Sequence, residues 1–416
     1  MRKKIAVFSA PLLVAAGLLF FVLLRSAANS TRFEMAHNFS VPGLVAEIIA
    51  ASPDGKTVVY TDSEARQFGW VDISNPAAPR SIGVFQAKQE PTSVAITKDG
   101  NWALGVVDDV PGRLEILDMK TRRLQREITF PGQPDCIVVS PDGRFAAIAI
   151  ENQREDEDLP MPHLPAGYLL IVDLKGAPRD WSTRRIALTD LKLRFPTDPE
   201  PEYIAINTQN EAAITLLENN GVAIVNLESG KILESWSCGE VSHKADLNSD
   251  GKMELKDELK NARREPDAIA WTPQGNLITA NEGDYSQDVD KDDNTFVGGR
   301  GFTVFSRQGK VLFDSGDNLE TEAMRADAYD DERSEKRGVE AEGVAILQRD
   351  GSTLAFIGCE YGNGAAMYDL GDESRPRFLQ WLKGGSSPEG LLALPERNLF
   401  LAANEGDGTI SIFQKR

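Results

Sequence analysis

The sequence predicts an all-β chain folded as a seven-bladed β-propeller, preceded by an N-terminal hydrophobic helix. Two observations predict the propeller. Seven units recur along the chain, and each contains an apolar strand, a tight polar turn and a second apolar strand. Successive units start 45, 43, 67, 65, 75 and 47 residues apart, and a four-stranded blade takes about 40–50 residues, so the longer steps carry insertions. Two packed β-sandwich domains are the alternative.

The first element is the N-terminal segment, residues 1–30. A basic stretch, Arg2–Lys4, precedes an apolar run of 20 residues, Ile5–Leu24. This run exceeds the about 7–15 residues of a signal-peptide core and matches the about 20 that span a bilayer. We therefore favour an uncleaved signal anchor over a cleaved signal peptide. Both place the rest of the chain outside the cytoplasm, because the basic end stays inside.

Residues 31–416 form the predicted propeller. Asp-Gly and similar pairs in the turns supply the positive φ that a tight hairpin needs. The seven turns are Ser52–Gly55, Lys98–Gly100, Ser140–Gly143, Gln209–Asn210, Pro273–Gly275, Arg349–Gly351 and Pro395–Arg397. The chain ends after the third strand of its last unit, so the segment Arg32–Phe39 is expected to supply the fourth strand and close the ring.

The long insertions are expected on one face of the disc. In a blade, the loop between the second and third strands and the loop to the next blade share a face, called here the top face. All four insertions fall in such loops, and long loops on a rigid scaffold commonly bind ligands. They are residues 152–167, 240–265, 284–300 and 318–339.

Acidic residues recur at two positions of the repeat, and topology places both at the top of the central channel. Inner strands begin with Glu47, Asp135, Glu202, Asp267, Glu342 and Glu389, and with Thr92 in the second unit. Second strands end with Asp108, Glu151, Glu218, Glu282, Glu360 and Glu405. Two tiers of carboxylates repel one another. A bound hard cation, shared protons or hydration would relieve that repulsion, and we expect a cation.

Composition narrows the partners and the chemistry. Lys and Arg number 45 against 64 Asp and Glu, so the net charge is 45 − 64 = −19. This sign argues against nucleic acid and against a polybasic membrane patch, and it favours cations. We expect membrane contact only through the N-terminal segment. With three Cys, three His, no CxxC and no HExxH, a closed cysteine-rich zinc site and a zinc hydrolase are not expected.

A calcium loop is predicted within the insertion at about 240–265. The sequence follows the pattern D-x-N-x-D-G with an acid at the twelfth position, in which Gly251 permits the sharp turn. The predicted ligands are Asp246, Asn248, Asp250, the carbonyl of Lys252 and Asp257. Asp257 replaces the usual Glu, as in dockerin loops, and 255–261 is expected to form the exiting helix. The run 288–294 resembles a second, degenerate calcium loop.

Several segments resemble the choice-of-anchor I proteins, which are secreted or surface-attached propellers often labelled alkaline-phosphatase-like. That family includes mesenchyme-specific cell-surface glycoproteins. The matching segments are Pro201–Ile204, Leu217–Asn220, Pro266–Ala270, Thr279–Asp284, Gly299–Phe302, Phe313–Asp317, Glu340–Gly343 and Pro388–Leu391. The resemblance covers most of the chain after residue 90 and implies an extracytoplasmic surface propeller. One departure is Ala341, where the family usually has Pro. A looser resemblance to propeller phytases implies calcium that binds phosphate.

Two functions are compatible with these features. The favoured one is an extracytoplasmic, calcium-binding surface propeller that recognises a surface ligand. The alternative is calcium-dependent phosphoester hydrolysis, in which bound metal polarises phosphate. Its candidate ligands or bases are Glu202, Glu218, Asp267, Glu282, Glu342, Glu360, Glu389 and Glu405, with Arg300 and Arg337 as candidate phosphate contacts. The sequence contains no serine-hydrolase elbow or P-loop, so binding is favoured.

Overall fold

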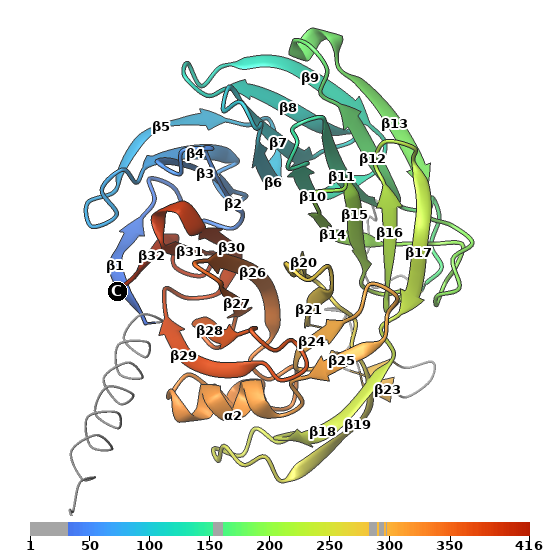
Figure 1. The fold of residues 1–416 in the computed structure, drawn as a ribbon, viewed down its shortest axis with the longest axis vertical. Helices are drawn as coiled ribbons and strands as arrows, with labels where there is room; N and C mark the ends of the chain where they lie inside the picture. The colour runs from blue at the N-terminus through green and yellow to red at the C-terminus, as the bar shows by residue number, and fades with distance from the viewer. Residues whose placement is uncertain (1–31, 153–160, 283–288, 291–294, 297) are drawn as a thin grey trace, which may run out of the picture.

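Seven four-stranded antiparallel sheets surround a central axis in the computed structural model (Figure 1). The structure describes residues 32–152, 161–282, 289–290, 295–296 and 298–416. The predicted all-β, seven-bladed propeller is thereby confirmed. The predicted anchor helix, residues 1–30, lies outside the described residues. Among the described residues, no helix is long and apolar enough to cross a membrane.

Each blade runs from an inner strand at the axis to an outer strand at the rim. Blade 1 is β2 (Ile49–Ala51), β3 (Thr57–Asp62), β4 (Gln67–Asp72) and β5 (Arg80–Gln86). Blade 2 is β6 (Glu90–Ile96), β7 (Trp102–Asp108), β8 (Gly112–Asp118) and β9 (Leu124–Phe130). Blade 3 is β10 (Gln133–Val139), β11 (Phe145–Glu151), β12 (Tyr168–Asp173) and β13 (Ser182–Ala187). Blade 4 is β14 (Pro201–Ile206), β15 (Glu211–Leu216), β16 (Gly221–Asn226) and β17 (Lys231–Ser237).

The remaining three blades complete the ring. Blade 5 is β20 (Ile269–Trp271), β21 (Leu277–Asn281), β24 (Gly301–Phe305) and β25 (Val311–Asp314). Blade 6 is β26 (Ala341–Arg349), β27 (Ser352–Cys359), β28 (Gly364–Asp369) and β29 (Arg377–Lys383). Blade 7 is β30 (Pro388–Leu394), β31 (Leu399–Asn404), β32 (Thr409–Lys415) and β1 (Phe33–Ser40).

The hydrophobic core lies between neighbouring blades. The middle strands are buried on both faces, so their sequences are continuous apolar runs. In β11, every residue from Phe145 to Ile150 is apolar and buried. The outer strands alternate, as in β13, because one face meets solvent. The clusters that result join adjacent blades, and one unites apolar side chains of blades 3 and 4. Burying both sheet faces this way holds the disc together.

The ring closes through strands from both ends of the chain, as predicted. β1 pairs antiparallel with β32, and the pairing runs from Phe33 opposite Lys415 to Ser40 opposite Thr409. Gln380 of blade 6 also brackets the first residue of β1, because its Oε1 accepts from the Phe33 N–H at 3.2 Å and its Nε2 donates to the Phe33 carbonyl at 2.9 Å. The closure leaves blade 7 complete.

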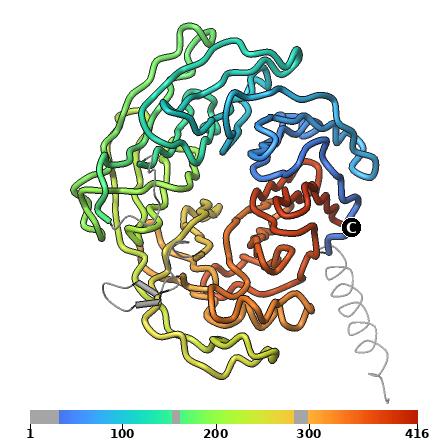
Figure 2. Tube along the Cα trace, turned by 180° about the vertical axis from the view of Figure 1, so that it is seen from behind, coloured from blue at the N-terminus to red at the C-terminus, as the bar shows by residue number. Residues whose placement is uncertain are grey.

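One secondary-structure prediction was wrong. Residues 255–261 do not form a helix; instead β19 (Asp257–Arg263) pairs with β18 (Glu240–Ala245) as an antiparallel hairpin. The alternation of the hairpin buries Leu259 and Ala262 against Ala245, which overrides the local helical tendency. The hairpin lies at the outer edge of the disc beside α2 (Asn318–Arg325) in both views (Figures 1 and 2).

The second candidate loop, 288–294, lies largely outside the described residues. Only its segment Val289–Asp290 is described, as the short strand β22, which pairs with β23 (Thr295–Phe296).

Candidate functional site

β-Bulges aim the acidic residues of the inner strands into the channel. The strand register shifts between Pro134 and Cys136, between Pro201 and Ile204, between Ala341 and Val344, and between Pro388 and Leu391. A bulge adds an unpaired residue and redirects its side chain. The redirected residues include Asp135, Glu202, Glu342 and Glu389. Pro201 and Pro388 are the first residues of their strands, where the lack of an N–H on proline costs no ladder hydrogen bond.

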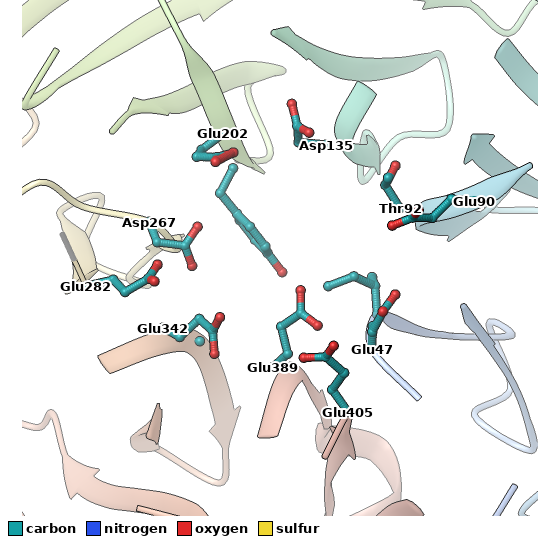
Figure 3. Close-up of a pocket in the computed structure, with 13 residues that line it drawn as sticks. Glu47, Glu90, Thr92, Asp135, Glu202, Asp267, Glu282, Glu342, Glu389 and Glu405 are labelled. Carbon is teal, nitrogen blue, oxygen red and sulfur yellow. The ribbon is translucent and has the colours of Figure 1, made fainter. Parts of the chain in front are cut away.

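The redirected side chains meet at one cavity of about 330 Å³ on the propeller axis. Figure 3 shows the carboxylates converging on it from different blades. Nine carboxylates line this cavity, called here the acidic mouth: Glu47, Glu90, Asp135, Glu202, Asp267, Glu282, Glu342, Glu389 and Glu405. The other lining residues are Ile48, Thr92, Tyr203 and Gly343, so no lysine or arginine is among the lining residues.

All six acidic residues predicted at the starts of inner strands line the acidic mouth, as does Thr92. Of those predicted at the ends of second strands, Glu282 and Glu405 line it. Asp108, Glu151, Glu218 and Glu360 are not among the lining residues. Sequence reasoning missed Glu90 and gave Tyr203 no role. The signal for Glu90 was its place directly before Pro91, two residues before the repeat position at Thr92.

Burial and mutual repulsion raise the pKa of the carboxylates in and around the acidic mouth. Burial raises the pKa of Glu47 to about 7; the Ser63 hydrogen bond opposes this, and Glu405 adds to it. Burial likewise raises the pKa of Glu360 to about 7, helped by Glu340. Burial, followed by neighbouring carboxylates, raises the pKa well above its ordinary value for Asp135, Glu151, Asp267, Glu282, Glu342 and Glu389. Positive charge from outside would let these groups ionise together.

Three carboxylates of blades 3 and 4 have the spacing of metal ligands. One oxygen from each of Asp135, Glu151 and Glu202 lies within 4.8 Å of the others. Within the part of the chain that the structure describes, Asp135 Oδ2 has no hydrogen-bond partner. Hard oxygen donors at this spacing suit Ca²⁺ or a similar divalent cation, whose remaining positions water can fill.

The predicted calcium loop brings three of its ligand side chains together. Asp246 is fully buried, and its oxygens accept from the Asn248 N–H at 3.2 Å and the Glu254 N–H at 2.7 Å. Asn248 Nδ2 lies 2.6 Å from Asp257 Oδ2. Gly251 adopts the expected positive φ of 80°.

The fourth ligand side chain, Asp250, points elsewhere. Its Oδ2 lies 3.4 Å from Lys252 Nζ and 3.7 Å from Lys256 Nζ. A calcium-bound loop therefore requires Asp250 to turn away from these lysines. The loop belongs to the peripheral hairpin, so it and the acidic mouth are separate candidate sites (Figure 1).

The two candidate phosphate contacts, Arg300 and Arg337, are both buried. Arg300 is 2% exposed and donates to the Asp246 carbonyl at 2.8 Å and the Ser334 carbonyl at 2.9 Å. It thus joins the calcium-loop insertion to the insertion after blade 5. Arg337 is 3% exposed and forms an ion pair with Glu340 at 2.6 Å. The positive charge of Arg337 lowers the pKa of Glu282, against the effect of burial. Arg337 therefore lies beside the acidic mouth, which Glu282 lines.

Comparison with protein families identifies the domain. The model of the choice-of-anchor I domain matches residues 47–296 and 288–373, which together make up most of the chain. The chain belongs to the choice-of-anchor I family. That membership fits a cell-surface or extracytoplasmic protein. The matched residues cover blades 1 to 5 and the first three strands of blade 6. No curated protein matches the sequence of this choice-of-anchor I protein.

Solved propellers share its fold at low sequence identity. The β-propeller domain of Cps50 (Swd1) from Myceliophteria thermophila has a TM-score of 0.60 and 12% identity, and covers 92% of this chain and 99% of its own. Hydrazine synthase from Kuenenia stuttgartiensis has a TM-score of 0.59 and 14% identity, with 90% and 96% covered. At these identities the likeness extends to the fold alone.

Proposed function

We propose that this choice-of-anchor I protein is an extracytoplasmic surface-recognition propeller that binds calcium, or a similar hard divalent cation, at its acidic mouth. The observation that carries the proposal is the cavity of about 330 Å³, which the described residues line with nine carboxylates and no basic side chain. A cation there offsets both the burial and the repulsion that raise the pKa of these groups. The N-terminal hydrophobic segment would tether the propeller to a membrane.

Three groups of residues at different places in the fold would have different roles. Asp135 and Glu202 of the acidic mouth would hold the cation together with Glu151, which lies outside the lining of the cavity, because oxygens of the three carboxylates already lie within 4.8 Å of one another. The 246–257 loop would bind a second calcium that stiffens the peripheral insertion. The insertions expected on the top face would then contact the surface ligand, a protein, a glycan or a mineral face, since long loops on one face of a rigid scaffold are suited to recognition.

Calorimetric calcium titration tests the site at the mouth. The double variant Asp135→Asn, Glu202→Gln keeps shape and removes two negative charges. We expect it to lose one bound calcium per chain and, in chelator, to melt above the unmodified protein because repulsion is relieved. Glu396→Gln is the matched control, since Glu396 is an exposed carboxylate in the turn between β30 and β31. Unchanged calcium stoichiometry in the double variant would contradict the proposed site.

A second candidate function, calcium-dependent phosphoester hydrolysis, is favoured by Arg337. Its guanidinium acts on Glu282 and Glu360, so positive charge borders the acidic mouth. A phosphate group there would meet both a metal and an arginine. Arg300 has no part in this scheme, because it is buried among backbone carbonyls. Turnover of phytate and aryl phosphates, with and without chelator, tests it; lack of calcium-dependent turnover would leave binding as the function.

A further inference from the structure

One aromatic side chain stands among the small residues of the channel wall. The residue after the acidic position is Tyr203 in blade 4 and a small or aliphatic residue in the other six blades: Ile48, Ser93, Cys136, Ala268, Gly343 and Gly390. Of these seven residues, Ile48, Tyr203 and Gly343 line the acidic mouth. Among the described residues that line it, Tyr203 is the one aromatic side chain.

The contacts of Tyr203 come from several blades. It packs against the apolar cluster of blades 3 and 4, the cluster of blades 4 and 5, and the cluster of blades 5 and 6. A side chain that packs against clusters drawn from blades 3, 4, 5 and 6 lies at the inner ends of these blades.

The backbone holds Tyr203 in this position. The residue sits in the bulge between Pro201 and Ile204, where the ladder hydrogen bonds are interrupted. Its N–H donates instead to Thr215 Oγ1 at 2.9 Å, and Thr215 Oγ1 lies 3.3 Å from the Tyr203 carbonyl. Thr215 is fully buried. The two contacts replace the missing ladder bonds, so the aromatic ring is held rigidly.

We propose that Tyr203 is the floor of the cation site: its ring closes the channel beneath the carboxylates, so that the acidic mouth is a cup that opens only at the top face. This rests on the proposed function, because it assigns a residue to that same site. Tyr203 is a positioning residue that limits how many waters reach the cation and requires ions and ligands to enter from the side where the insertions lie.

Terbium luminescence tests the floor. Tb³⁺ takes calcium sites, and a tyrosine close to the ion sensitises its emission, whereas direct excitation of terbium reports binding without any tyrosine. Every protein in this experiment also carries Asp250→Ala. This substitution removes a ligand of the 246–257 loop, so terbium bound in that loop no longer contributes to the emission. We expect Tyr203→Phe to abolish most tyrosine-sensitised emission while directly excited terbium still binds. The control Tyr329→Phe, at a tyrosine outside the acidic mouth, should keep the sensitised emission.

A second variant tests closure. Tyr203→Ala opens the floor, so the number of waters on bound terbium, measured from emission lifetimes in H₂O and D₂O, should rise above that of Tyr203→Phe. Full sensitised emission in Tyr203→Phe, or equal hydration in Tyr203→Ala, would overturn the role of Tyr203 while leaving cation binding intact. If directly excited terbium does not bind at all, the proposed function itself fails, and this inference fails with it.

Discussion

Glu115 shows how one buried carboxylate sets a pH dependence. It is fully buried in β8, and neither of its oxygens has a hydrogen-bond partner among the described residues. Burial, then Glu127, raises its pKa from 4.5 to about 7. A raised pKa in the folded state means that the folded protein binds the proton more tightly. The contribution of the Glu115 proton to the free energy of unfolding is therefore complete below pH 4.5 and is lost as the pH rises towards about 7.

Replacement of Glu115 by glutamine should remove this dependence. We expect Glu115→Gln to unfold at nearly the same urea concentration as the unmodified protein near pH 4.5. Above pH 7 it should be more stable, by about 2–3 kcal/mol, because a neutral amide incurs no charging cost. Urea unfolding at both pH values measures the difference. Equal stabilities of the two proteins above pH 7 would contradict the assignment.

At the scale of the element, the closing strand β1 provides the matched pair Phe33 and Met35. Phe33 is fully buried and meets the ring of Phe356 edge-on, with centroids 5.4 Å apart. Met35 is 43% exposed on the same strand. We expect Phe33→Ala to lower the free energy of unfolding by about 3–5 kcal/mol and Met35→Ala to change it little, as thermal or urea unfolding would show. Similar losses in both variants would argue against closure through the buried face of β1.

The predicted calcium loop at the periphery permits a test that separates ligation from packing. Asp246 is buried and accepts two backbone N–H groups, so Asp246→Ala should lower the melting temperature with or without calcium. Asp250 lies near the side chains of Lys252 and Lys256 and accepts from the Lys252 N–H. Asp250→Asn should therefore reduce the calcium-induced rise in melting temperature and leave the value in chelator unchanged. An equal loss in chelator would show that Asp250 is structural.

At the scale of the whole molecule, the ring of blades concentrates negative charge on its axis. Glu47 and Glu360, with pKa values of about 7, ionise between weakly acidic and neutral pH. Ionisation without a cation destabilises the fold, and it also creates the ligands a cation needs. The melting-temperature difference between calcium and chelator should thus be small near pH 4.5 and larger above pH 7. Calorimetric scans measure it, and a difference independent of pH would contradict cation binding at the acidic mouth.

The seven-bladed fold and most of the acidic mouth could be predicted from sequence. Turns such as Ser140–Gly143 mark each hairpin locally, and their period counts the blades. An acidic residue at the same place in each unit, such as Glu202 or Glu389, must return to the same radius of a closed ring. These conclusions need only local turn chemistry and repetition, so the sequence alone determined the fold class and the ring of inner-strand carboxylates.

Only the tertiary structure decided what meets across the blades. Glu90 and Tyr203 both line the acidic mouth, although neither sits at the repeated acidic position. Arg300 is buried between two insertions far apart in sequence, and residues 257–263 form a strand because β18 lies beside them. The physical reason is the same for these four observations. Bulges, burial and strand pairing depend on partners from other blades or insertions, and a local sequence pattern does not contain that information.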